Sequence, residues 1–113
     1  MHLKSKLVAF AACAMLAAGA AAQSVGADLA RSKACLACHQ VDSKRVGPPL
    51  RSVAERYAAQ SEAMQYLAGK IRGGSRGAWG SVPMPAQSQV TEEQARQLAQ
   101  WVLSLAAERP TAP

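Results

Sequence analysis

The sequence predicts a small all-α domain, and three observations support that prediction. Apolar residues recur at the spacing of a helix face along most of the chain, and no long stretch alternates between apolar and polar residues as a half-buried strand does. Capping residues and glycine stops mark where helices begin and end. Removal of a predicted export signal leaves 91 of the 113 residues, which is the length of one small domain.

Residues 1–22 form that predicted export signal. Two lysines precede an apolar run that is too short to cross a membrane, which takes about 20 residues. Ala20 and Ala22 are the small residues that a signal peptidase requires, so we predict cleavage near Ala22 and a periplasmic domain over residues 23–113. The mature domain has 11 basic and 7 acidic residues, a net charge of about +4, and we expect no stable membrane association.

The first predicted helix runs into a cysteine motif. Val25, Leu29, Ser32 and Leu36 are spaced so that they share one helix face. A second short helix is predicted over residues 50–57, because its first, fourth, fifth and eighth positions are apolar.

A third helix is marked by Met64, Leu67 and Ile71, which recur at helical spacing. Ser61 is its expected N-cap, and two glycines at residues 73–74 are its expected stop. At this spacing Met64 is interpreted as a core residue rather than as a metal ligand.

The last helix has the clearest pattern. Residues 91–94, Thr-Glu-Glu-Gln, form a capping box in which the acidic residues complement the helix dipole rather than act as a catalytic pair. Leu98, Trp101, Val102 and Leu105 follow as the stripe that we expect to be buried.

Residues 73–90 separate the third and fourth helices, and we expect these 18 residues to lack regular structure. A loop this long in a small domain is either functional or disordered. Because it contains Trp79, Val82 and Met84, we expect it to be ordered against another group. Its arginines and glycines resemble a nucleic-acid-binding segment only superficially, and export argues against such a partner.

The short sequence Cys35-Leu-Ala-Cys38-His39 carries the chemistry. A structural zinc site needs four Cys or His ligands, and the mature chain has three such residues. A thioredoxin-like dithiol would accompany a βαβ pattern, which is absent, and a simple disulfide remains an alternative in an exported protein. C-x-x-C-H in an exported chain is the attachment signal for haem c. We therefore predict one haem bonded through Cys35 and Cys38, with His39 as an iron ligand, and expect it to complete a core that contains no Phe.

The second iron ligand decides the function. The mature chain has no other histidine, so the candidates are Met64, Met84, a lysine or none. Met84 lies between Pro83 and Pro85, which keep it extended and outside any helix, so we favour it as the ligand. A thioether raises the reduction potential and closes the iron to substrates. The pattern therefore favours electron transfer, and we do not expect an enzyme.

Four segments, "CLACH", "VGPPL", "WGSVPMP" and "EEQARQLAQWVLSLA", resemble in order and spacing the small bacterial class I cytochromes c of the c-551 (c8) type. The similarity extends from about Val25 to Ala107. It implies a compact all-α class I cytochrome c fold, with four to five short helices around one covalently bound haem c, and a role as a periplasmic one-electron carrier. It also implies redox partners such as nitrite reductase, a terminal oxidase, cytochrome c peroxidase and an upstream quinol-oxidising complex, and we expect a monomer.

The resemblance also implies roles around the haem. Pro48 corresponds to the residue whose carbonyl accepts a hydrogen bond from the His39 ring, and Trp79 to the indole donor to a haem propionate. Lys70 stands where the family often has an arginine near that propionate. Gln87 replaces an Asn whose side chain contacts the ligand sulfur.

Two other functions stay open from the sequence. One is a haem-based sensor or gas-binding protein whose Met84 is labile. The other is the electron-entry subunit of a larger redox enzyme, in which the exposed haem edge would be buried in a permanent complex.

Overall fold

The computed structural model describes residues 19–21, 23 and 25–108. The predicted signal peptide falls on residues 1–22, of which 1–18 and 22 lie outside the described residues. Within the described part of the chain, none of the helices has the length and apolar character needed to cross a membrane.

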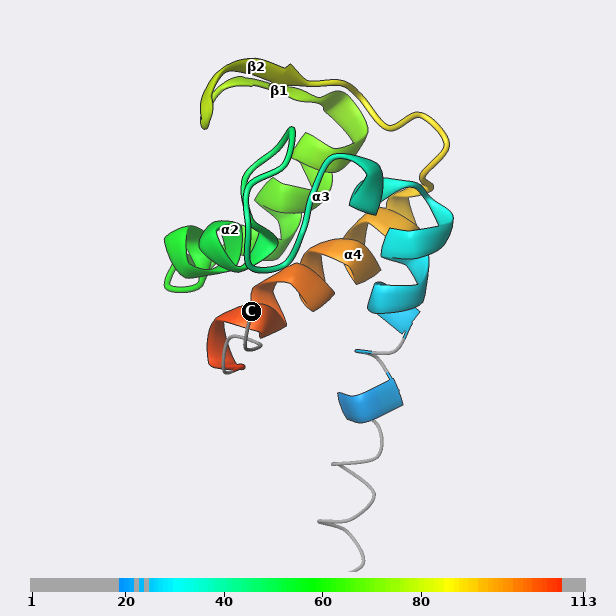
Figure 1. The fold of residues 1–113 in the computed structure, drawn as a ribbon. Coiled ribbons are helices and arrows are strands. Elements are labelled where there is room, and N and C mark those ends of the chain that lie inside the picture. Colours follow the sequence, from blue (N-terminus) through cyan, green and yellow to red (C-terminus); the bar gives the residue numbers. More distant parts are fainter. Residues whose placement is uncertain (1–18, 22, 24, 109–113) are drawn as a thin grey trace, which may run out of the picture.

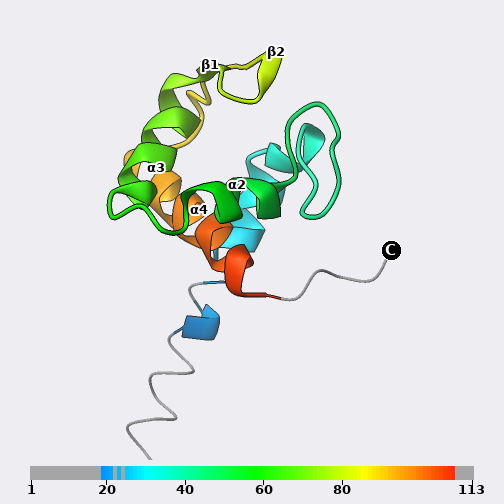
Figure 2. The same ribbon diagram turned by 90° about the vertical axis from the view of Figure 1, so that its left-hand side faces the viewer.

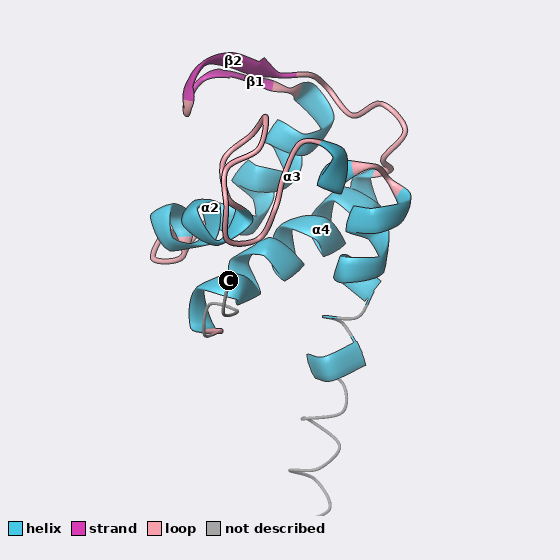
Figure 3. Ribbon diagram, viewed as in Figure 1, coloured by secondary structure: helices cyan, strands magenta, loops and turns pink. Residues whose placement is uncertain are grey.

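The predominantly helical fold predicted from the sequence is confirmed (Figures 1 and 3). Helix α4 lies in the middle, packs against α2 and α3, and is continued by η2, which contacts α2. A first helix over residues 25–32 precedes these elements. In chain order the remaining elements are η1 (Cys35–Ala37), α2 (Leu50–Tyr57), α3 (Ala63–Gly73), β1 (Ser75–Gly77), β2 (Gly80–Met84), α4 (Glu92–Ser104) and η2 (Leu105–Ala107).

Helix α4 begins as the sequence predicts. The Thr91 hydroxyl accepts a hydrogen bond from the Gln94 backbone N at 3.2 Å, and the Gln94 side chain accepts one from the Thr91 backbone N at 3.0 Å. These reciprocal bonds satisfy backbone donors that a helix start otherwise leaves unpaired. The expected stripe is also confirmed at Leu98, Val102 and Leu105, which are buried.

Trp101 belongs to the same face of α4 but is only half-buried, because it packs against the first helix at the edge of the core. A Cβ at Gly26 would lie 2.2 Å from the Trp101 Cβ. Only glycine therefore lets the two helices cross this closely. Much of the core is alanine, and Leu98 and Val90 are the largest fully buried side chains among the described residues.

Two details of α3 correct the sequence prediction. Glu62, not Ser61, is the N-cap, and no side chain caps this end. Met64 is not a core residue, since it is 37% exposed. The buried face of α3 is formed instead by Ala63, Leu67 and Ala68, and Met64 lies at the edge of that face.

A two-stranded antiparallel hairpin forms within residues 73–90. The expectation that these residues lack regular structure was therefore wrong. Ser75 pairs with Met84 and Gly77 with Gly80, with an irregularity between these pairs. The strands have three and five residues and include glycines, so they are too short to show alternation. The hairpin projects beyond the helices from the end of α3 (Figure 1).

The first helix is shorter than predicted and does not run into the cysteine motif. Residues 33–34 form a turn, and Leu36 lies in η1 rather than on the first helix. Ala34 adopts a left-handed conformation, with φ 64° and ψ 20°, which redirects the chain immediately before Cys35. Val25, at the other end of the expected stripe, is 43% exposed.

This left-handed turn generates a stability prediction. A residue with a Cβ pays roughly 1 kcal/mol in this conformation, whereas glycine adopts it freely. We expect Ala34→Gly to raise the free energy of unfolding by about 0.5–1 kcal/mol, as measured by denaturant titration.

Ala37→Gly is the matched control, because Ala37 is exposed within η1 and has no positive φ. It should lower stability by about 0.5–1 kcal/mol. Equal losses in the two variants would contradict the strained turn at Ala34.

Candidate functional site

A cavity of about 520 Å³ lies between the segment that follows η1 and the β1–β2 hairpin. Its volume is within the range of about 300–1,000 Å³ that is typical of ligand pockets. Figure 2 shows the hairpin and the loop after the cysteine motif apart from each other, both extending beyond α2 and α4. All seven residues singled out from the sequence line this cavity: Cys35, Cys38, His39, Pro48, Lys70, Trp79 and Met84.

The cysteine motif forms one tight turn. The Cys35 carbonyl accepts hydrogen bonds from the backbone N of Cys38 at 3.2 Å and of His39 at 3.0 Å. The two cysteines are not bonded to each other, and Cys35 is half-buried and Cys38 exposed. Burial is the largest influence on Cys35 and raises the pKa of its thiol, outweighing a backbone hydrogen bond that lowers it. The turn thus presents two thiols and an imidazole to one cavity.

The orientation of His39 is set by the segment that follows it. Its Nδ1 lies 2.9 Å from the Pro48 carbonyl oxygen, which is the contact implied by the sequence. A carbonyl only accepts hydrogen bonds, so Nδ1 carries the proton and Nε2 keeps a free lone pair. The Gly47 backbone N donates to the Cys38 carbonyl at 2.7 Å and holds the segment against the motif. A Cβ at Gly47 would lie 2.5 Å from Cε1 of His39, so this close approach requires glycine.

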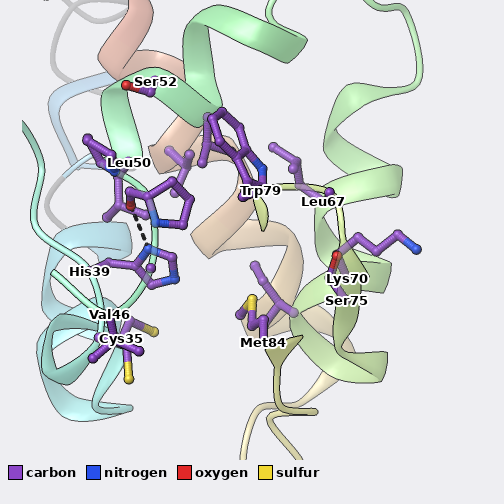
Figure 4. A pocket seen from close by; sticks show the side chains of 18 of the residues that line it. Cys35, His39, Val46, Leu50, Ser52, Leu67, Lys70, Ser75, Trp79 and Met84 are labelled. Atoms are coloured by element: carbon purple, nitrogen blue, oxygen red, sulfur yellow. Dashed lines mark hydrogen bonds between the residues drawn. The ribbon is translucent and has the colours of Figure 1, made fainter. Parts of the chain in front are cut away.

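Met84 occupies the other side of the cavity. Figure 4 shows its side chain and the His39 imidazole on facing walls. Met84 is half-buried at the end of β2, and its carbonyl would lie 2.8 Å from a Cβ at Gly74, which has a φ of 81°. The backbone N of Gln87 donates to the Ile71 carbonyl at 3.0 Å and ties the segment beyond Met84 to α3.

The Gln87 side chain also lines the cavity, and its hydrogen bonds are to neighbouring residues of its own segment. Its amide donates to the Pro85 carbonyl at 2.8 Å and accepts from the Gln89 side chain at 2.8 Å. In this structure Gln87 therefore stiffens the segment after Met84.

Trp79 and Lys70 lie on the hairpin side of the cavity. Trp79 is half-buried in the turn between the strands, and the Cζ of Arg56 lies 3.4 Å from its ring centroid. Lys70 points away from the centre of the cavity in Figure 4, and its ammonium nitrogen lies 5.4 Å from the ring centroid of Tyr66. The ring centroids of Tyr66 and Tyr57 lie 5.1 Å apart with the rings tilted by 41°, and hydrogen bonding to Tyr57 raises the pKa of Tyr66.

One organising residue was missed from the sequence. Arg51 is buried in α2, where its guanidinium donates to the Asp42 carboxylate, to the Leu105 carbonyl and, at 2.8 Å, to the Glu108 carbonyl. The hydrogen bond to Asp42 is the main cause of a raised pKa for Arg51. Arg51 therefore joins the segment after His39 to the C-terminal end of the core. Its signal in the sequence was an arginine next to Leu50 at the start of this helix, and helix periodicity alone does not predict that such an arginine is buried.

These residues fit the haem expected from the sequence. The cavity wall is largely apolar, its two thiols sit on one turn, and its imidazole and thioether lie on facing walls. Imidazole and thioether are the donor pair that binds iron in many c-type haem sites. Among the described residues no group of three or more His, Cys, Asp or Glu side chains is arranged to hold a metal ion by itself.

Comparison with known proteins agrees with this site. The sequence model of the family Cytochrome c matches residues 24–106. The chain is 51% identical over 96 residues to cytochrome c-552 of Nitrosomonas europaea, covering 85% of this chain and 91% of that protein. It is 44% identical over 82 residues to cytochrome c-551 of Pseudomonas denitrificans, covering 73% and 99%. The crystal structure of wild-type Nitrosomonas europaea cytochrome c552 superposes with a TM-score of 0.69 at 52% identity, covering 70% of this chain and 98% of that one.

The contact between Gly47 and the His39 ring generates the second prediction. In Gly47→Ala the new Cβ would displace the ring from the Pro48 carbonyl, and we expect a loss of about 1–3 kcal/mol in the free energy of unfolding. Thermal and denaturant unfolding measure that loss.

Gly69→Ala is the control for that substitution. A Cβ at Gly69, within α3, meets no atom within 4 Å, so this variant should gain up to about 1 kcal/mol from helix propensity. A Gly47→Ala protein as stable as wild type would mean that the close approach is not needed.

Proposed function

This chain belongs to the cytochrome c family. From that premise we propose that His39 and Met84 hold its haem iron, and that the protein shuttles electrons between periplasmic redox proteins. The chain is a monohaem electron carrier of the c-551/c-552 type rather than an enzyme. Its haem c is attached covalently through the C-x-x-C-H motif.

The observation that carries the proposed ligation is the placement of His39 and Met84 on facing walls of one cavity (Figure 4). The hydrogen bond from Nδ1 to Pro48 leaves Nε2 of His39 as the nitrogen that can bind a metal. Met64, the other methionine of the mature chain, is exposed on α3 and does not line the cavity.

The bound haem supplies one-electron chemistry between ferrous and ferric iron. The chain's own residues set the reduction potential of that exchange and the access of other molecules to the iron. A neutral, soft thioether at Met84 favours the ferrous state and raises the reduction potential. It also occupies the position at which a small substrate would bind. The apolar wall excludes water from the region around the two ligands.

The mouth of the cavity is where we place electron exchange with a partner. Val46 and Val82 line the cavity and are 53% and 63% exposed, so they present apolar surface there. Lys44 also lines the cavity and is exposed. Together with the net positive charge of the mature chain, this surface suits an acidic redox protein, and association should weaken as salt concentration rises. We expect a monomer located in the periplasm.

The ligation proposal is tested by removing the thioether. We expect Met84→Ala to abolish the sulfur-to-iron charge-transfer band of the ferric protein, to lower its reduction potential and to allow carbon monoxide to bind the ferrous protein. Absorption spectroscopy and a redox titration measure these changes.

Met64→Ala is the matched control, and its band and potential should equal those of wild type. If the wild-type protein itself lacks the band and binds carbon monoxide readily, Met84 is not a stable ligand and the protein is better explained as a gas-binding haem sensor. If Met64→Ala loses the band instead, the ligand assignment is wrong.

A further inference from the structure

The β1–β2 hairpin depends on contacts with the rest of the domain. Among the described residues its two strands pair only with each other, and an isolated two-stranded ribbon is marginally stable in water. At its base the chain is held by the Gly74 backbone N, which donates to the Lys70 carbonyl at 2.9 Å, and by the bond from Gln87 to Ile71. The turn at residues 78–79 lies at the far end, where these bonds do not reach.

Arg56, in the last turn of α2, holds that far end. Its Nη1 donates to the Ala78 carbonyl at 2.8 Å, and its Cζ lies 3.4 Å from the centroid of the Trp79 ring. Within the described chain, this is the only hydrogen bond that joins residues 75–83 to a helix. One guanidinium thus fixes the turn through its backbone and stacks on its aromatic side chain.

The stacking leaves the edge of the Trp79 indole free. Trp79 lines the cavity, and among the described residues its Nε1–H has no hydrogen-bond acceptor. A cation on the ring face draws electron density from the indole, which strengthens the N–H as a donor toward an anionic group. A planar guanidinium also restricts rotation of the ring more than a flexible ammonium does.

A fixed positive charge beside the cavity also acts on electron affinity. The ferric form of a haem carries one more positive charge than the ferrous form, so a nearby cation disfavours oxidation and raises the reduction potential. Arg76, on β1 of the hairpin, is exposed as Arg56 is, and neither side chain lines the cavity. Arg76 differs in that it does not stack on Trp79.

We propose that Arg56 is a positioning residue, which holds the Trp79 indole N–H toward the haem carboxylates and thereby raises the reduction potential. This inference rests on the proposed function for the presence of the haem, and on the family resemblance for the carboxylate that Trp79 faces. The guanidinium acts through Trp79 and does not itself contact the haem.

The test is hydrogen exchange of the indole N–H groups in the reduced, haem-bearing protein, measured by NMR alongside the reduction potential. In Arg56→Gln we expect the Trp79 N–H to exchange about two- to five-fold faster, corresponding to the loss of one exposed cation–π contact. The N–H of Trp101, which packs against the first helix, should be unchanged and serves as an internal reference.

Arg76→Gln is the matched control, because it removes an equal charge from the hairpin that Arg56 contacts. It should leave Trp79 exchange unchanged and lower the potential less than Arg56→Gln does. Arg56→Lys keeps the charge without the planar stack, so its Trp79 exchange should also rise, with a smaller fall in potential. This conservative variant provides the readout if Arg56→Gln does not fold.

The proposal is overturned if the Trp79 N–H exchanges no faster in the Arg56 variants than in Arg76→Gln. It is also overturned if the reduction potential of Arg56→Gln is no lower than that of Arg76→Gln. Failure of the proposed ligation is a separate result. It would appear as a missing sulfur-to-iron band in the wild-type protein, whatever the Arg56 variants do.

Discussion

An apolar cavity of about 520 Å³ lies in a domain whose core is rich in alanine. The packing of the cavity walls against the haem is the interaction on which the rest of the structure depends. Unfilled volume in a protein core is destabilising, and the whole stability of a small domain is only about 5–15 kcal/mol. This cavity is partly open, at Val46 and Val82, so the cost is smaller than that of a closed cavity, but covalently attached haem supplies the contacts that the polypeptide lacks.

The two sides of the cavity are built by different means. On the His39 side, the Gly47 backbone N donates to Cys38 and the Pro48 carbonyl accepts from His39. The buried Arg51 connects the segment that follows the motif to the core. On the Met84 side a short hairpin extends from α3, held by backbone bonds at its base and by Arg56 at its turn. The two proposed iron ligands therefore come from separately anchored segments. His39 can be held rigidly while the position of Met84 is adjusted through the hairpin.

The sequence predicted the structure correctly where a motif is specific to one kind of site, or where apolar residues recur clearly at helical spacing. The C-x-x-C-H motif, the capping box at Thr91 and the contact between His39 and Pro48 are all present as expected. Prediction failed where tertiary contacts decide the local structure. The hairpin strands are too short for alternation to be visible, and Met64 lies just outside the buried face of α3. The role of Arg51 depends on carbonyls more than fifty residues away, which no local pattern reveals.

The dependence of the fold on the haem is tested most directly by unfolding a chain that cannot attach it. In the Cys35→Ala/Cys38→Ala protein, helix content followed by circular dichroism during denaturant titration should fall gradually, without the cooperative transition of the haem-bearing protein. A single cooperative transition in the haem-free chain, with a denaturant slope close to that of the haem-bearing chain, would contradict the account. It would show that the thin core folds without its cofactor.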